Sequence, residues 1–201
     1  MLSETAPRTT TRAPIPVKIV VAGGFGVGKT TFVGAISDIE PLTTEAAMTT
    51  VGAGVDNRGD VSTKTTTTVA MDFGRVAVDS SIVLYIFGTP GQDRFGFMWD
   101  DLIVGALGAV VLVDLRRIDD CFPAIDYFEE HEIPFIIGVN AFDYATRFDL
   151  DEVRDALGVG PDVPLVNCDA RDRESVKSVL VALTEEVLTK RLGRERAASA
   201  W

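Results

Sequence analysis

Short apolar runs alternate along the chain with segments of helical periodicity. Four runs, each followed by polar or glycine residues, are "VKIVVAG" (17–23), "GAVVLVDL" (108–115), "IPFIIGVN" (133–140) and "VPLVNCD" (163–169). Continuously apolar runs of this length are typical of strands that are covered on both faces. The stretch "TTTVAMDFGRVAVDSSIVLYIFG" predicts two further strands joined by a turn near Asp79–Ser80.

Helical segments separate these strands. One helix is predicted from Gly28 to about Ser37. The last helix is marked by apolar residues at helical spacing and by a Lys190/Arg191 pair that suits its C-terminus; the apolar residues are Val176, Leu180, Leu183 and Val187. Alternating strands and helices predict an open, mainly parallel α/β sheet.

The predicted topology indicates where a ligand binds. Ligands of such sheets bind at the carboxyl ends of the strands, so the loops after residues 23, 88, 140 and 168 are expected to converge on one site. The 201 residues suffice for one domain. We expect a mobile Thr/Pro-rich tail over 1–13, a domain over 14–192 and a short tail over 193–201. Residues 40–64 are rich in small residues and are expected to form a long, functional or disordered loop.

Composition excludes several classes of function. The net charge of −11 argues against nucleic acid as the main partner. No apolar run reaches the length of a membrane span, and we find no signal peptide or lipidation motif, so a cytoplasmic protein without a lipid anchor is expected. Cys121 and Cys168 are interpreted as free thiols. The single histidine, His131, excludes a metal site built on several histidines.

The first loop carries a phosphate-binding motif. "GGFGVGKTT" contains Gly23, four residues and then Gly28-Lys29-Thr30, which is G-x-x-x-x-G-K-T between a strand and a helix. The backbone N–H groups and the helix N-terminus favour an anion. Lys29 is expected to reach the terminal phosphates, and the Thr30 hydroxyl to bind Mg²⁺. The predicted nucleotide-binding residues here are Phe25, Gly26, Val27, Gly28, Lys29, Thr30 and Thr31.

A later loop carries a candidate base-reading motif. "NAFD" follows the apolar run that ends at Asn140. The carboxylate of Asp143 can accept hydrogen bonds from guanine N1–H and the 2-amino group, a donor pair that adenine lacks. Asn140 can connect this loop to the phosphate loop. An exposed polar turn is the alternative interpretation of N-x-x-D.

Taken together, these segments resemble a known family. "GGFGVGKTT", "TVAMDFG", "GTPGQDRF", "NAFD" and "CDAR" fall in the order and spacing of the nucleotide motifs of Ras-like small GTPases, over about residues 15–192. The resemblance implies a three-layer G domain with a mixed, mostly parallel six-stranded sheet flanked by about five helices. It also implies that Thr68 joins Thr30 in holding Mg²⁺, that Gly91 meets the γ-phosphate, and that Gln92 orients the attacking water.

The resemblance also assigns the last guanine loop and a subgroup. Asp169, Ala170 and Arg171 take the place of the last guanine triplet, with the Ala170 N–H directed at the guanine oxygen. Gly88 takes the place of the aspartate that usually lies on the metal side, and the sequence "PGQ" is retained. In this combination the chain is similar to bacterial MglA-type GTPases. The segments "TTTTVAMDFG" and "GTPGQDRF" most resemble those of actinobacterial GTPases of conservon clusters (CvnD-like). That subgroup implies a Roadblock-type regulator and sensor-kinase-linked partners.

Gly88 bears on how the metal is held. The missing aspartate often acts on Mg²⁺ through water, and Mg²⁺ keeps several waters readily. The metal is therefore expected to bind, but more weakly, and Gly88→Asp is expected to tighten it. The alternative is that Gly88 reflects a degenerate enzyme.

Three further residues leave alternatives open. Phe25 could crowd the approach of an arginine finger, or simply pack against neighbouring loops. Arg58 and Arg94 are the arginines nearest in sequence to the predicted switch segments, and each could act as a finger in cis or be a solvated surface charge.

The sequence thus predicts a GTP-binding switch that slowly hydrolyses GTP to GDP, with Lys29 and Gln92 as catalytic residues. One alternative is a nucleotide-dependent binding module without turnover. A P-loop kinase is less favoured because we find no arginine-bearing lid and "NAFD" would go unexplained.

Overall fold

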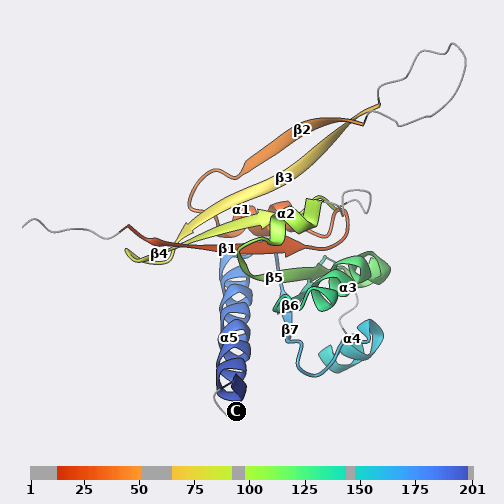
Figure 1. Ribbon diagram of the computed structural model, residues 1–201. Helices are drawn as coiled ribbons and strands as arrows, with labels where there is room; N and C mark the ends of the chain where they lie inside the picture. Colours follow the sequence, from red (N-terminus) through yellow and green to blue (C-terminus); the bar gives the residue numbers. More distant parts are fainter. Residues whose placement is uncertain (1–12, 51–64, 92–97, 144–147, 199–201) are drawn as a thin grey trace, which may run out of the picture.

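The computed structural model describes residues 13–50, 65–91, 98–143 and 148–198, and for 43–50, 65–70 and 197–198 the backbone alone. These residues form a seven-stranded sheet in the order β2-β3-β4-β1-β5-β6-β7 (Figure 1). The strands are β1 (Ile15–Ala22), β2 (Leu42–Thr50), β3 (Thr65–Ala77), β4 (Ile82–Gly88), β5 (Ala106–Val113), β6 (Phe135–Asn140) and β7 (Leu165–Cys168). Pairing is parallel from β4 through β1 to β7, and antiparallel for β2–β3 and β3–β4.

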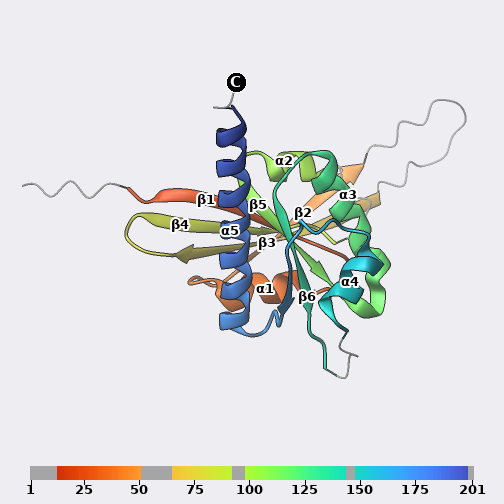
Figure 2. The ribbon, with the colours of Figure 1, turned by 90° about the horizontal axis from the view of Figure 1, so that it is seen from below.

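Helices cover both faces of this sheet. They are α1 (Lys29–Ile36), α2 (Trp99–Ile103), α3 (Phe122–Glu130), α4 (Leu150–Leu157) and α5 (Arg173–Ala198), with a 3₁₀ segment, η2 (Leu115–Cys121). One buried cluster joins α1 and α5 to the sheet, and a second joins the opposite face to α2, α3 and α4. Figure 2 shows α5 lying across one face of the sheet. The predicted three-layer, mostly parallel α/β fold is confirmed.

The predicted strands agree with the observed ones to within about two residues at most ends, because each is a continuously apolar run that only a doubly covered position accommodates. The turn at Asp79–Ser80 is also present: the Asp79 carboxylate accepts hydrogen bonds from the N–H groups of Ser81 and Ile82 at 2.6 and 2.9 Å.

Two boundaries differ from the sequence prediction. The expected loop over 40–64 contains β2, which pairs with β3 from Leu42↔Phe73 to Thr50↔Thr65 and adds a seventh strand. Its threonines suit a strand, but only the antiparallel partner makes that preference decisive. The last helix does not end at Lys190 and Arg191, since α5 continues to Ala198. Neither position carries a glycine or proline that would stop the helix.

Within the described residues, none of the helices has the length and apolar character needed to cross a bilayer.

Candidate nucleotide site

The phosphate loop lies between β1 and α1, at the carboxyl edge of the sheet. Gly28 caps α1 with a φ of 106°, and a Cβ there would lie 2.7 Å from Nδ2 of Asn140. Only glycine accepts both the positive φ and this close approach. The first helical bond runs from the Phe32 N–H to the Gly28 carbonyl at 2.8 Å. The loop therefore presents the N-terminus of a regular helix to an anion.

Lys29 curls back over this loop. Its Nζ donates to the carbonyls of Gly23 and Gly24, both at 2.7 Å, and the residue is 8% exposed. Burial lowers the pKa of Lys29 to about 8, and the charge of Asp72 opposes that shift. A buried cation held on two carbonyls gains from an anionic ligand, because only an opposite charge compensates fully for its lost hydration.

Asp72 is the functional candidate that the sequence analysis missed. It lies on β3 directly opposite Gly88 of β4, and its carboxylate accepts a 2.6 Å hydrogen bond from the hydroxyl of Thr30. A Cβ on Gly88 would lie 3.2 Å from Oδ2 of Asp72. A carboxylate from the neighbouring strand thus lies beside position 88. The sequence contains this aspartate inside the predicted strand "TVAMDFG". The antiparallel register that places it beside Gly88 could not be predicted from the sequence.

The donor set of Thr30 and Asp72 fits Mg²⁺. Both supply hard oxygen atoms, and Asp72 is 7% exposed. The described residues contain no cluster of three or more His, Cys, Asp or Glu side chains suited to a metal. A Mg²⁺ ion at these two residues would therefore draw its other ligands from phosphate oxygens and water.

The turn after β4 lies against the phosphate loop. The Thr89 N–H donates to the carbonyl of Val21 at 2.9 Å. A Cβ on Gly91 would lie 2.6 Å from Nζ of Lys29 and 2.9 Å from Cα of Phe25. Gly91 is therefore next to the lysine that the sequence assigns to the terminal phosphates. Gln92, Arg58 and Arg94 lie outside the described residues. Thr68 is in β3, where its backbone pairs with Ala47, and its side chain is not described.

Asn140 joins three loops. Its Nδ2 donates to the Val27 carbonyl at 2.8 Å, and its Oδ1 accepts from the Ala170 N–H at 3.0 Å. The side chain is buried, so these bonds fix the phosphate loop, the loop after β6 and the loop after β7 relative to one another. The expected convergence of these loops is observed. The Ala170 N–H, assigned to the guanine oxygen, here bonds to Asn140.

The candidate base-reading carboxylate is accessible and paired with an arginine. The Asp143 side chain is 70% exposed and accepts a 2.9 Å bond from Arg171. Arg171 also binds Asp169 through Nε and Nη2, both at 2.9 Å, and this hydrogen bonding lowers the pKa of Asp169. Three of the residues that the sequence assigned to guanine recognition, Asp143, Asp169 and Arg171, therefore form one charged cluster.

An aromatic contact supports the same loop from the β5 side. The Arg116 guanidinium lies 3.8 Å from the centre of the Phe142 ring and donates twice to Asp114, at 2.9 and 2.7 Å. These loops enclose an open cavity of about 430 Å³, a size within the range of small-molecule sites. It is lined by Asp114, Leu115, Val139, Asn140, Ala141, Phe142, Phe148, Asn167, Cys168, Asp169, Asp172 and Ser175.

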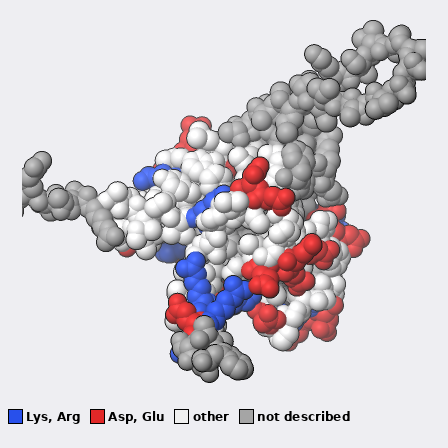
Figure 3. All heavy atoms as spheres, in the orientation of Figure 1, with Lys and Arg blue, Asp and Glu red and all other residues white. Residues whose placement is uncertain are grey.

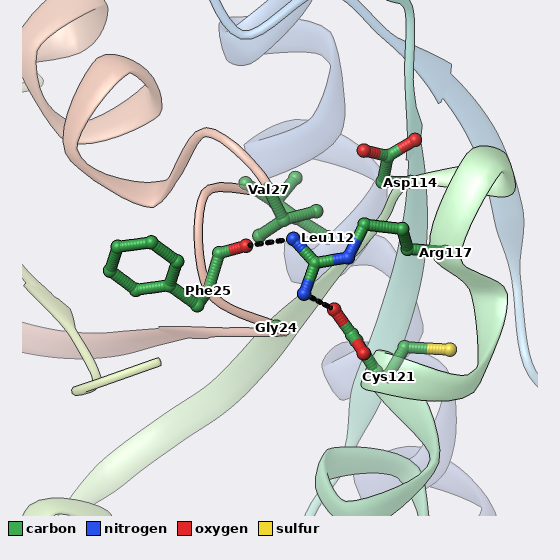
Figure 4. Close-up of a pocket in the computed structure, with 8 residues that line it drawn as sticks. Gly24, Phe25, Val27, Leu112, Asp114, Arg117 and Cys121 are labelled. Atoms are coloured by element: carbon green, nitrogen blue, oxygen red, sulfur yellow. Dashed lines mark hydrogen bonds and ion pairs between the residues drawn. The ribbon is translucent and has the colours of Figure 1, made fainter. Parts of the chain in front are cut away.

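Arg117 contacts the outer side of the phosphate loop. Figure 4 shows its guanidinium between the Phe25 carbonyl, which accepts a 3.3 Å bond, and the carboxylate of Asp120. The 3₁₀ segment is interrupted at Arg117, whose φ and ψ are non-helical. A Cβ on Gly24 would overlap Asp120, so η2 packs directly on the loop. The Phe25 ring is 64% exposed and points away from Arg117. Sequence reasoning did not single out this arginine.

Acidic residues are unevenly distributed over the molecular surface. Figure 3 shows them gathered over the side of α3 and α4, whereas basic side chains gather near the C-terminal part of α5. Among the described residues, Lys29 and Arg117 are cations that hydrogen-bond directly to the phosphate loop.

The fold and the phosphate loop together define a nucleotide-binding P-loop protein with a GTPase-like G domain. A family described as conserved hypothetical ATP-binding proteins matches residues 21–190, and the chain belongs to this family.

Two relatives are similar to this chain in sequence. Uncharacterized protein MJ1339 of Methanocaldococcus jannaschii is 33% identical over 129 residues, which cover 63% of this chain and 71% of that protein. Human Ras-related protein Rab-7b is 23% identical over 191 residues, or 89% of this chain and 86% of Rab-7b.

The structural neighbours show the fold. The FeoB G-domain of Methanococcus jannaschii has a TM-score of 0.56 at 16% identity, covering 86% of this chain and 97% of that domain. The GDP form I of the cytosolic domain of T. maritima FeoB has a TM-score of 0.58 at 17% identity, covering 88% of this chain and 65% of that chain.

Proposed function

We propose that the protein is a GTP-binding switch that slowly hydrolyses GTP to GDP. The observation that carries this proposal is the double hydrogen bond of buried Asn140, which ties Val27 of the phosphate loop to Ala170 of the last loop. A nucleotide lying on this edge would have its phosphates at Lys29 and its base at Asp143.

The base assignment is our own and differs from the description of the family. Its matched description mentions ATP, whereas a carboxylate at the base edge favours guanine, which offers two donors to it. Arg171 forms an ion pair with Asp143 at 2.9 Å. A guanine would add two hydrogen bonds to this carboxylate, whereas adenine offers it no such donor pair.

Mg²⁺ is proposed as the cofactor, held by Thr30 and Asp72, with Thr68 as a further expected ligand. When bound, the ion would neutralise charge on the phosphate oxygens. The chain's own residues contribute the rest: Lys29 supplies the cation at the terminal phosphates, and Gln92 is proposed to orient the attacking water.

The MglA-type, conservon-cluster resemblance refines this proposal. It suggests a cytoplasmic signalling role, a Roadblock-type regulator that orders Gln92, and partners linked to sensor kinases. These partners are predictions from the sequence resemblance.

A single-turnover assay tests the hydrolysis. Purified protein is loaded with GTP and Mg²⁺, and GDP formation is followed; we expect about 10⁻⁴ to 10⁻³ s⁻¹, as for G domains without an arginine finger. Gln92→Ala is expected to slow it further, while Lys29→Ala is expected to lose nucleotide binding with an unchanged circular dichroism spectrum. Tight GTP binding without turnover, alone or with a partner, would instead identify a binding module.

A further inference from the structure

The residues that follow β6 are held at both ends, but not equally well. At one end, the buried side chain of Asn140 bonds to two other loops. At the other end, the Asp143 carboxylate pairs with Arg171. Both of these side chains are more than half exposed, and an exposed ion pair contributes little to fixing its partners. The contact that holds Phe142, between the two ends, therefore affects where Asp143 lies.

Arg116 holds the Phe142 ring from the loop that follows β5. Its guanidinium lies 3.8 Å from the centre of the ring, which is within the range of a cation–π contact. The ring is half-buried, and together with Asn140 it lines the open cavity at this edge of the sheet. The loop that carries Asp143 is thus supported by a residue that belongs to a different loop.

The guanidinium of Arg116 is itself fixed by a buried carboxylate. Its Nε and Nη2 donate to the two oxygens of Asp114 at 2.9 and 2.7 Å, and the Arg116 backbone N–H donates to the same carboxylate at 3.0 Å. Asp114 is 8% exposed, and hydrogen bonding from Arg116 lowers the pKa of its carboxyl. A bidentate, charge-assisted pair on a buried acceptor holds its geometry better than an exposed pair. Arg116 therefore connects the rigid end of β5 to the Phe142 ring.

We propose that Arg116 is a positioning residue for base recognition, which acts through the Phe142 ring on the Asp143 carboxylate. Phe142 and Asp143 are consecutive, so a ring held in place restricts the backbone that carries the carboxylate. A guanine that meets an oriented carboxylate does not have to order it first, and such preorganisation raises affinity. Adenine lacks the donor pair and gains nothing from it. The inference rests on the function proposed above: Arg116 adds to the preference for guanine and not to the phosphate contacts.

Competition of GDP and ADP for a fluorescent GDP analogue, bound to the full chain with Mg²⁺, tests this role. Arg116→Gln keeps a donor for Asp114 but removes the cation from the ring. It is expected to weaken GDP binding about twofold to fivefold and to leave ADP binding unchanged. Arg116→Lys is expected to retain part of the GDP affinity, because it keeps the positive charge. Arg194→Gln is the matched control and is expected to bind like the parent, since Arg194 pairs with Glu132 outside the loops of the site.

A double-mutant cycle separates action through the ring from other effects of the charge. Phe142→Leu removes the ring and is expected to weaken GDP binding as well. Adding Arg116→Gln to Phe142→Leu is expected to cause no further loss, because the contact between the two side chains is already gone. An ion pair that only stabilised the fold would lower the free energy of unfolding without changing the ratio of GDP to ADP affinity.

Hydrogen exchange of the nucleotide-free protein gives a readout that needs no ligand. The Ala141 N–H donates to the Cys168 carbonyl at 2.7 Å, directly before the Phe142 ring. Exchange of the Ala141 amide is expected to accelerate in Arg116→Gln, while exchange of the β1 amides stays unchanged. Circular dichroism shows whether each variant is folded.

An unchanged ratio of GDP to ADP affinity in folded Arg116→Gln overturns the proposal. So does an equal loss of affinity for both nucleotides, a further loss when Arg116→Gln is added to Phe142→Leu, or unchanged exchange of the Ala141 amide. A parent chain that binds GDP and ADP equally contradicts the proposed function together with this inference. A parent that prefers GDP, with a preference that Arg116→Gln keeps, contradicts the inference alone.

Discussion

At the residue scale, the candidate site contains one carboxylate that reaches the Thr30 hydroxyl from an unexpected strand. Asp72 on β3 bonds to Thr30 and occupies the space beside Gly88. The glycine is therefore explained by its neighbour: a side chain at 88 would meet the Asp72 carboxylate at 3.2 Å. Two carboxylates this close would repel each other.

This geometry reverses the effect expected for Gly88→Asp from sequence alone. With Asp72 in place, Gly88→Asp is expected to leave Mg²⁺ affinity unimproved. Asp72→Asn is expected to weaken Mg²⁺ at least about tenfold by removing the charge while keeping the shape. The double variant Asp72→Gly with Gly88→Asp is expected to recover part of the loss. Calorimetric Mg²⁺ titration of the GDP complex measures this.

Asp126→Asn is the control for that series, because Asp126 is exposed on α3, away from Thr30. Unchanged Mg²⁺ affinity in folded Asp72→Asn would remove Asp72 from the metal site.

A second prediction concerns Arg117, whose guanidinium holds the phosphate loop at the Phe25 carbonyl. Arg117→Met is expected to speed GDP release about threefold to tenfold, in line with the loss of about 1 kcal/mol for one hydrogen bond. Arg117→Lys is expected to retain part of the effect. Release of a fluorescent GDP analogue measures the rate.

Arg194→Met is the control for Arg117, because Arg194 is similarly exposed but pairs with Glu132, outside the loops of the site. Equal release rates in Arg117→Met and the parent would show that the contact does not position the loop.

The site residues that belong to sequence motifs could be assigned to the site from the sequence, whereas Asp72 and Arg117 could not. Lys29 and Asn140 follow apolar strands, so their loops had to meet at one edge of a parallel sheet. Asp72 and Arg117 depend on an antiparallel register and on an interrupted 3₁₀ segment, neither of which has a local sequence signal.

At the element scale, the same contrast holds for strands and helices. The buried strands were predictable because their apolar runs fit only a doubly covered sheet. The edge strand β2 was not, since its Thr-rich sequence is compatible with a loop until β3 pairs with it. The end of α5 was misplaced because a basic pair favours a helix terminus without enforcing one.

The short helix α2 is attached to α3 by a small aromatic cluster. Trp99 stacks on Phe128 at a ring separation of 6.0 Å and meets Tyr127 edge-on at 5.0 Å. The Tyr127 hydroxyl donates to Asp100 at 2.6 Å. This cluster therefore anchors α2, which follows the predicted switch residues in the sequence, to α3.

Tyr127→Phe is expected to loosen α2 without unfolding the domain, because it removes one hydrogen bond worth about 1 kcal/mol and keeps the ring. Hydrogen exchange of residues 99–103 is expected to accelerate, while exchange in β5 stays unchanged. Exchange that rises everywhere, or nowhere, would contradict a local attachment.

At the scale of the whole molecule, two separate cores hold the sheet between its helical layers. Each contains one buried cysteine: Cys168 lies in the core shared with α1 and α5, and Cys121 in the core shared with α3 and α4. Burial raises the pKa of each thiol to about 12. Raising the pKa lowers the thiolate fraction at neutral pH, and the thiolate is the reactive form.

Both thiols are therefore expected to react with iodoacetamide at pH 8 at least about a hundredfold more slowly in the native protein than in urea. Mass spectrometry of labelled peptides distinguishes the two positions. Fast labelling of one cysteine in the native state would show that its helical layer opens on its own.

The account rests most heavily on the claim that the carboxyl edge of this sheet binds a guanine nucleotide through Asp143. The most direct measurement is competition between GDP and ADP for a fluorescent GDP analogue bound to the full chain with Mg²⁺. We predict that GDP competes at least about a hundredfold better than ADP, and that Asp143→Ala loses most of this preference, because guanine offers the carboxylate two hydrogen-bond donors that adenine lacks. Comparable affinities for GDP and ADP, or a preference that Asp143→Ala leaves intact, would contradict the account.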